Sequence, residues 1–325
     1  MDRNTITGLV LIGLILTVFS IINRPSEEDI KEQQKKELAK TEKIKADKNK
    51  AIVNDSIVQD TTVTDQPIMT DATEMISDTV EPRVKQVVRD TVIVKETDKF
   101  IIHFSNIGGQ IQSLYLKEYK SYNNYKANKN EALCLFDKGD HLTAFTFYDG
   151  DTRVNTAKWD FDFDNSKANS ITFSCDYKKG KIVQTYQLKK GSFNVDYKVQ
   201  FVKLDNVSKD NIQLTWKTSF LQTEKLLSEQ RRVSTVCFNE VEEGFDYLSE
   251  TSDDESDIEN DVTWIAYKQS YFSSILQPQQ PFQKKKSKML VRTYSEGSKK
   301  DATHVKDFES VLSLNLDKNS NNTVS

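Results

Sequence analysis

The pattern of apolar and polar positions divides the chain into three regions, and the first is apolar. The 18 residues from Thr5 to Ile22 carry no charge. As an α-helix they would be about 27 Å long, close to the roughly 30 Å hydrocarbon core of a bilayer. No small-x-small cleavage site follows this run, so the pattern predicts a retained transmembrane signal anchor over residues 1–23. Positions along this predicted span are Ile6, Gly8, Leu11, Gly13, Leu16, Phe19 and Ile22.

The second region, residues 24–99, is polar. Residues Glu27–Lys50 are dense in Glu and Lys and lack sustained apolar heptads, which is typical of a solvated helix leaving a membrane. Residues Asn54–Lys99 are rich in Thr, Asp, Val and Ser and contain no aromatic residue. Such a composition indicates a disordered spacer, which we expect to hold the folded body away from the bilayer.

The third region begins at Phe100, where short runs of alternating apolar and polar residues appear between Gly, Asn, Asp and Ser. About a dozen such runs occur, with only five prolines in the chain and no alternation of strands with helices. The pattern predicts an all-β fold, a large antiparallel β-sandwich over residues 100–318, followed by a polar tail at residues 319–325. The segment "EKLLSEQRR", Glu224–Arg232, is the one predicted helix.

The segment "FIIHFSNIGGQIQSLYLKEY" contains the clearest turn signal. Its first run ends at Ser105 and Asn106, and Gly108–Gly109 can adopt the positive φ angles of a tight turn. Neither GxGxxG nor GxxxxGK[ST] is present, and no helix follows, so this is not a phosphate loop. The segment predicts a β-hairpin.

Composition and charge narrow the possible chemistry. The net charge is only −4 and no basic face is evident, so a nucleic-acid partner is not indicated. The few cysteines lack CxxC or zinc spacing and are predicted to be buried free thiols, and three histidines are too few for a histidine-rich metal site. We predict no cofactor and no metal. The cysteines are Cys134, Cys175 and Cys237, and the histidines are His103, His141 and His304.

Two charged runs are interpreted as surface features. Residues Glu250–Asp261 hold seven acids in twelve positions but lack the glycine and spacing of an EF-hand, which predicts a solvated loop. Residues Lys284–Lys288, "KKKSK", predict an exposed turn that protects strand edges, with contact to anionic lipid or to the acidic run as the alternative.

No catalytic signature is visible: the chain has no nucleophile elbow, Ser-x-x-Lys or HExxH motif. A strand histidine could still act as acid or base in a sugar-binding or mutarotase-like enzyme. That alternative requires a histidine within hydrogen-bonding reach of a buried carboxylate. A second alternative is an anchored scaffold protein with no link to membrane insertion.

Four segments resemble the YidC family of bacterial membrane protein insertases. The opening "MDRNTITGLVLIGLILTVFSIINRPSEE" resembles the family's N-terminus. "FSNIGGQIQSLYLKEY", "EKLLSEQRR" and "WIAYKQSYFSSIL" resemble segments of its periplasmic domain, in family order. The positions that carry the motifs of this domain are Phe104, Asn106, Gly108, Gly109, Trp264 and Phe272.

The resemblance implies a bacterial inner-membrane protein with a cytoplasmic N-terminus and a periplasmic β-super-sandwich of the galactose-mutarotase type. It also implies three kinds of partner: the lipid bilayer, components of the Sec translocon, and nascent membrane proteins. The implied role is to assist insertion and folding of inner-membrane proteins, with and without Sec. By the positive-inside rule alone, Arg3 before the span and Arg24, Lys31, Lys35, Lys36 and Lys40 after it would place the body in the cytoplasm. Long domains, however, translocate largely regardless of charge.

The end of the sequence departs from the family pattern. In the family, five further transmembrane helices with an arginine-bearing groove follow the periplasmic domain. Here the sequence ends in "LSLNLDKNSNNTVS", and no second apolar run approaches 18 residues. We therefore expect a truncated fragment, one product of a split gene, or a diverged tail, and we do not expect this chain to insert proteins alone.

Overall fold

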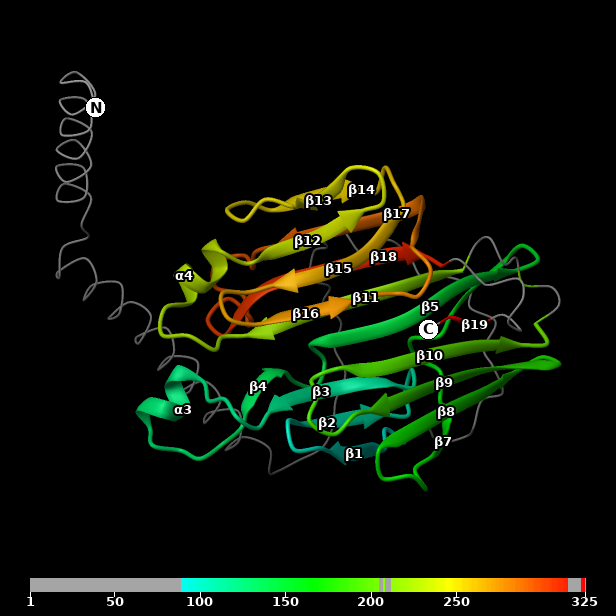
Figure 1. Ribbon diagram of the computed structural model, residues 1–325, viewed down its shortest axis with the longest axis horizontal. Coiled ribbons are helices and arrows are strands. Elements are labelled where there is room, and N and C mark those ends of the chain that lie inside the picture. Colours follow the sequence, from blue (N-terminus) through cyan, green and yellow to red (C-terminus); the bar gives the residue numbers. More distant parts are fainter. Residues whose placement is uncertain (1–88, 205–206, 208–211, 315–322, 325) are drawn as a thin grey trace, which may run out of the picture. The chain divides into compact units, whose positions relative to one another are not determined.

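The computed structural model describes residues 89–204, 207, 212–314 and 323–324. Within them, strands pair antiparallel throughout and form four sheets, which confirms the all-β antiparallel prediction (Figure 1). The predicted span, the charged helix and most of the predicted spacer lie outside the described residues. Among the residues that are described, no helix is long and apolar enough to cross a membrane.

The N-terminal sheet begins earlier than the predicted start at Phe100. Its first strand alternates buried and exposed positions, and Ile93 pairs with Phe104 of the next strand. The boundary at residue 100 therefore needs correction: the absence of aromatic residues concealed a short strand with period-two burial. In spatial order this sheet contains β1 (Val92–Glu96), β2 (Phe100–Ser105), β3 (Gln110–Leu116) and β4 (Leu133–Phe136). Helix α3 (Tyr122–Lys126) lies in the connection from β3 to β4.

The central sheet has six strands and includes both charged runs. In order they are β14 (Asp254–Asp257), β17 (Gln283–Arg292), β18 (His304–Ser313), β11 (Gln213–Leu221), β5 (His141–Asp149) and β6 (Thr152–Asn155). The predicted acidic loop thus contains edge strand β14, and the predicted basic turn is part of β17. Strand β14 pairs with the second half of β17, where Asp257 lies opposite Lys288, and the Glu255 carboxylate lies 3.5 Å from Lys288 and 3.0 Å from Arg292. Opposite charges across neighbouring strands stabilise a polar edge that apolar periodicity does not reveal.

Two further sheets complete the described part. The lateral sheet contains β19 (Thr323–Val324), β10 (Val195–Val202), β9 (Gly180–Leu188), β8 (Ser170–Tyr177) and β7 (Asp162–Asp164). The outer sheet contains β13 (Gly244–Tyr247), β12 (Thr235–Glu240), β15 (Val262–Lys268) and β16 (Ser273–Leu276). Helix α4 (Leu227–Arg232) precedes β12 and confirms the predicted helix, although it begins three residues later than predicted.

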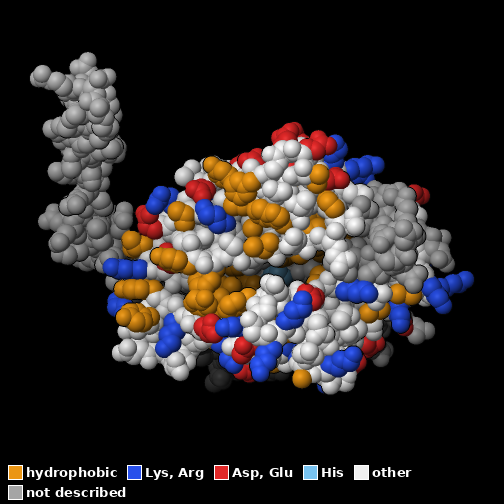
Figure 2. Space-filling view, viewed as in Figure 1, with side chains coloured by type: hydrophobic (Ala, Val, Ile, Leu, Met, Phe, Trp, Pro, Cys, Tyr) orange, Lys and Arg blue, Asp and Glu red, His pale blue; other side chains and the backbone are white. Residues whose placement is uncertain are grey.

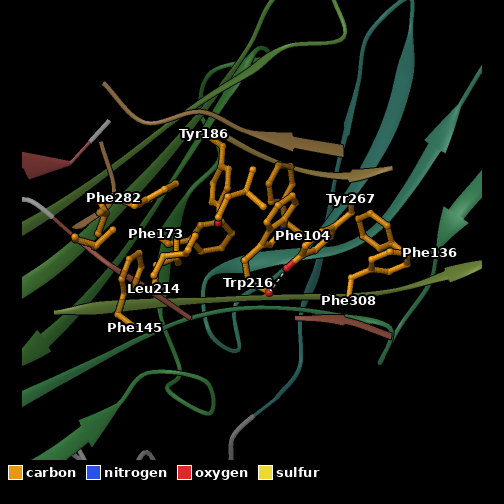
Figure 3. Packing of buried hydrophobic residues seen from close by; sticks show 14 of the residues in the cluster. Phe104, Phe136, Phe145, Phe173, Tyr186, Leu214, Trp216, Tyr267, Phe282 and Phe308 are labelled. Carbon is orange, nitrogen blue, oxygen red and sulfur yellow. Dashed lines mark hydrogen bonds between the residues drawn. The ribbon is translucent and has the colours of Figure 1, made fainter. Parts of the chain in front are cut away.

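One hydrophobic core joins the four sheets, and within it aromatic rings from different sheets contact one another (Figure 3). Trp216 of β11 stacks on Tyr267 of β15 with ring centroids 3.9 Å apart. The buried Tyr267 hydroxyl donates a hydrogen bond to the Trp216 carbonyl at 2.6 Å, and its oxygen lies 3.0 Å from Ser310 Oγ. Further pairs connect the other sheets: Phe145 with Phe201, Phe104 with Phe173, and Phe136 with Phe220. The central sheet is therefore held on its neighbours by large rings, among which Tyr267 also has its hydroxyl group hydrogen-bonded.

Candidate binding surface

The Gly108–Gly109 turn joins β2 to β3, which confirms the predicted hairpin, and it is packed against the lateral sheet. Both glycines have positive φ angles, of +77° and +60°. Gln184 Nε2 donates to the Gly108 carbonyl at 2.9 Å, and the Tyr186 hydroxyl donates to the Gly109 carbonyl at 3.0 Å. A Cβ on Gly109 would lie 2.8 Å from Gln184 Nε2, so the close approach requires glycine. The turn is a structural joint between two sheets.

Asn106, just before this turn, uses its side-chain amide to hold three chain segments. Its Nδ2 donates to Asp160 Oδ1 at 2.6 Å and to the Arg89 carbonyl at 3.0 Å. Its Oδ1 accepts from the Thr91 backbone N–H at 2.6 Å. Phe104 is buried in the core. Four of the six positions that carry the family motifs therefore act in packing and hydrogen bonding within the fold.

The geometric condition for the mutarotase-like alternative is met by one histidine. His304 Nε2 lies 3.1 Å from Asp140 Oδ1, and both residues are buried. Lys300 Nζ also lies 2.8 Å from that oxygen, and Thr303 Oγ1 lies 2.8 Å from His304 Nδ1. Burial raises the pKa of the Asp140 carboxyl, but hydrogen bonds from His304 and Lys300 outweigh it, so the pKa is lowered. An ionised carboxylate paired with the Lys300 ammonium is a poor general base, and the Asp140–His304 pair is better described as a link between β5 and β18.

His141 and His103 do not form such a pair. His141 Nδ1 lies 2.9 Å from Thr218 Oγ1 and its Nε2 3.0 Å from Thr143 Oγ1, and its ring stacks on Phe136. Burial lowers the pKa of His141 to about 3, so the imidazole is neutral. Among the described residues no group of three or more His, Cys, Asp or Glu side chains is placed to hold a metal ion.

Helix α4 also has a structural role. The side chain of Gln230 is fully buried: its Nε2 donates to Thr223 Oγ1 and to Gln269 Oε1, both at 2.9 Å. Arg231 binds the Asp301 carboxylate at 3.0 Å and donates to the Val305 carbonyl. These two polar residues tie the helix to the central and outer sheets, a role that the helical pattern alone does not indicate.

The outer sheet exposes large apolar side chains on the side that faces away from the core. Phe245 and Tyr247 of β13 are 61% and 54% exposed, and Ile275 of β16 is 63% exposed. The ring of Phe245 lies 6.1 Å from both Tyr247 and Trp264 of β15. Figure 2 shows hydrophobic side chains gathered over these strands. We call this surface, formed by Phe245, Tyr247, Trp264 and Ile275, the outer face.

A second exposed aromatic group lies where three loops meet. Tyr119 follows β3, Phe193 lies between β9 and β10, and Phe272 lies between β15 and β16. Tyr119 is 5.2 Å from Phe272 in an edge-to-face contact and 6.4 Å from Phe193. The Lys99 ammonium lies 5.7 Å from the centre of the Phe193 ring. The two motif positions outside the joint, Trp264 and Phe272, are themselves partly buried, and each contacts an exposed aromatic ring.

The sequence did not indicate which aromatic residues contact Trp264 and Phe272. The only signal for the outer face is the alternation in "GFDY", where two aromatic residues flank an acid on a strand next to the acidic run. Exposed apolar groups of this kind mark interaction surfaces in soluble domains. The arrangement can bind an apolar segment of another chain, and it holds no group suited to bond making or breaking.

Comparison with known proteins identifies the domain. Residues 92–316 match the family model described as the YidC periplasmic domain. The chain belongs to the YidC family. It is 26% identical over 323 residues to the protein named membrane protein insertase YidC of Bacteroides fragilis strain YCH46, covering 98% of this chain and 48% of that one. The protein of the same name from Parabacteroides distasonis is 29% identical over 299 residues, covering 87% of this chain and 45% of that one. The chain spans about half the length of the curated relatives it matches.

YidC membership confirms the resemblance seen in the sequence and indicates an inner-membrane protein with a periplasmic domain. Among solved structures, a galactose mutarotase-like protein from Lactobacillus casei ATCC 334 is similar with a TM-score of 0.40 and 14% identity, covering 69% of this chain and 87% of that one. A galactose mutarotase related enzyme from Lactobacillus acidophilus gives 0.39 and 9%, covering 71% and 89%. Similarity at this level decides nothing about a ligand or an activity.

Proposed function

We propose that this chain is the N-terminal portion of a membrane protein insertase and chaperone, which anchors a periplasmic domain and docks clients or partners on it. The match of residues 92–316 to the YidC periplasmic domain carries the proposal, and the printed name of the relatives supports it. In this proposal residues 5–22 span the inner membrane, the N-terminus is cytoplasmic and the folded body is periplasmic. The partners are nascent membrane proteins and components of the Sec translocon.

The described residues suit docking better than catalysis. The polar groups that could do chemistry, Asp140 and His304, are buried and bonded to each other. The outer sheet, by contrast, exposes aromatic side chains such as Phe245 and Tyr247. Because tethering raises the effective concentration of a binding surface near the membrane, even weak docking would retain an emerging segment.

Site-specific crosslinking tests this function. A photo-crosslinking phenylalanine analogue is placed at Phe245 of the full chain in living cells, and at Phe163 of β7, which is 41% exposed, as a matched control. We expect position 245 to capture newly made membrane proteins or Sec components more strongly than position 163. Equal capture at both positions, or capture of water-soluble periplasmic proteins alone, would contradict the proposal.

A further inference from the structure

The outer face lies beside the most acidic part of the chain. Residues Glu240–Asp261 contain eleven Asp and Glu residues and no Lys or Arg. This segment includes β13 and β14 and leads directly into β15. Of its acids, Glu250 and Glu255 form ion pairs with basic residues elsewhere in the described part of the chain, whereas Glu242, Glu243 and Asp261 form none there. The outer face is therefore bordered by acids at the β12–β13 turn that are unpaired within the described part of the chain, whereas the acids of β14 lie against the basic residues of β17.

The charges are placed at the ends of the strands that carry the aromatic residues. Glu242 and Glu243 lie in the turn between β12 and β13, next to Phe245. Asp261 lies immediately before β15 and three residues before Trp264; its carbonyl accepts from the Val241 N–H at 2.8 Å, and its carboxylate accepts from the Lys284 N–H at 2.9 Å. At the opposite end, Lys268 is neutralised by Glu250 at 2.5 Å. An apolar centre is thus bordered by acids without a competing free cation on the same strands.

We infer that the outer face binds a cationic apolar segment of a client polypeptide, in which Lys or Arg residues flank hydrophobic side chains. Hydrophobic side chains of the segment cover Phe245, Trp264 and Ile275, and its cations reach the acids at the strand ends. Exposed aromatic faces add a cation–π contribution. Four strands spaced about 4.8 Å apart give a surface wide enough for one helix of about 10 Å diameter. This inference rests on the proposed docking function and names the chemistry of the docked partner.

The acids at the border of the outer face disfavour two other possible occupants, an anionic lipid bilayer and a second copy of the chain. Anionic lipid head groups attract basic surfaces, so a surface bordered by Glu242 and Glu243 is repelled by them. A second copy of the chain would bring two acidic borders together, and like charges facing each other oppose association. Charge complementarity therefore selects a positively charged segment over a bilayer or a homodimer.

Fluorescence anisotropy with designed peptides tests this inference. The full 325-residue chain is held in phosphatidylcholine nanodiscs, and empty nanodiscs serve as the lipid control. The probe is a labelled amphipathic peptide of Leu and Lys, and its matched control carries Glu in place of every Lys. We expect the Lys peptide to bind at least tenfold more tightly than the Glu peptide at low salt. Most of this difference should disappear at high salt, because ions screen exposed charges.

Three variants locate the binding surface. The double variant Phe245→Thr/Trp264→Thr should weaken binding of the Lys peptide about tenfold, because aromatic anchors dominate such contacts. Glu242→Gln/Glu243→Gln should weaken it about threefold at low salt and have no effect at high salt. Phe163→Thr, which removes an exposed aromatic ring from β7, should leave binding unchanged. Circular dichroism verifies that each variant is folded.

Several outcomes would overturn the inference. They are equal binding of the Lys and Glu peptides, an effect of Phe163→Thr as large as that of the double variant, and flotation of the chain with anionic vesicles that Phe245→Thr abolishes. Concentration-dependent dimerisation that Phe245→Thr abolishes would assign the surface to a second copy instead. If peptide binding fails while crosslinking from position 245 still captures membrane proteins, the docking function stands and only the cationic chemistry is wrong.

Discussion

The glycine turn and the outer face both contain positions that resemble YidC motifs, but their surroundings are opposite. At the turn, Gly109 is enclosed by the side chains of Gln184 and Phe173. At the outer face, Phe245 and Tyr247 are more than half exposed. Motif resemblance alone does not separate residues that hold the fold from residues that are free to bind a partner. Burial and hydrogen bonding do, and the two regions should therefore respond differently to substitution.

The largest effect is expected at the turn. Gly109→Ala would place a Cβ 2.8 Å from Gln184 Nε2 and 3.0 Å from Phe173 Cβ, at a φ of +60°. Steric overlap and backbone strain together should lower the free energy of unfolding by about 3 kcal/mol, measured by urea denaturation of the full chain.

Substitution of a second glycine, Gly139, measures the cost of backbone strain without the cost of close packing. Gly139 also has a positive φ, of +85°, but a Cβ there would meet nothing within 4 Å. Gly139→Ala should therefore cost only about 1 kcal/mol. Equal losses at the two positions would show that the turn is not packed as tightly as described.

An intermediate effect is expected at the half-buried His141, and it depends on pH. Burial lowers its pKa to about 3 in the folded chain, against 6.5 in the unfolded chain. As pH falls below 6.5, the unfolded state takes up a proton that the folded state does not, so stability decreases. Between pH 7.5 and 5, the chain should lose about 1 to 2 kcal/mol more than the His141→Gln variant.

Urea denaturation at several pH values measures this difference. The His103→Gln variant is a suitable control, because His103 is also on a strand but its ring contacts Tyr115 rather than two threonine hydroxyls. If the His141→Gln variant loses as much stability on acidification as the unaltered chain, the neutral imidazole of His141 is not responsible for the loss.

The smallest effect on stability is expected at the outer face. Phe245→Thr removes an exposed ring from an edge strand and retains a residue that favours strands. The free energy of unfolding should change by less than about 0.5 kcal/mol, although client capture decreases. A loss of several kcal/mol would indicate that this ring stabilises the sandwich and would remove the contrast between the two regions.

Strand existence was predictable where apolar residues alternate with polar ones and turn residues separate the runs, as in β2 and β3 around Gly108–Gly109. It was not predictable in β14, where four polar residues form an edge strand. That strand forms because its charges pair across to β17 and its backbone completes a ladder. The hydrophobic pattern indicates only which side of a strand faces the core. A strand without a buried apolar side therefore cannot be recognised from that pattern.

The sequence by itself determined the antiparallel β class, the hairpin at the glycines, helix α4 and the resemblance to YidC, because these depend on local periodicity, turn residues and short motifs. Only the tertiary structure decided that Gly109 and Asn106 serve as internal joints while Trp264 is grouped with the exposed Phe245. Burial and charge surroundings are set by segments far apart in the chain. For the same reason, the pairing of Asp140 with His304, 164 residues away, could not be inferred before the strands were assembled.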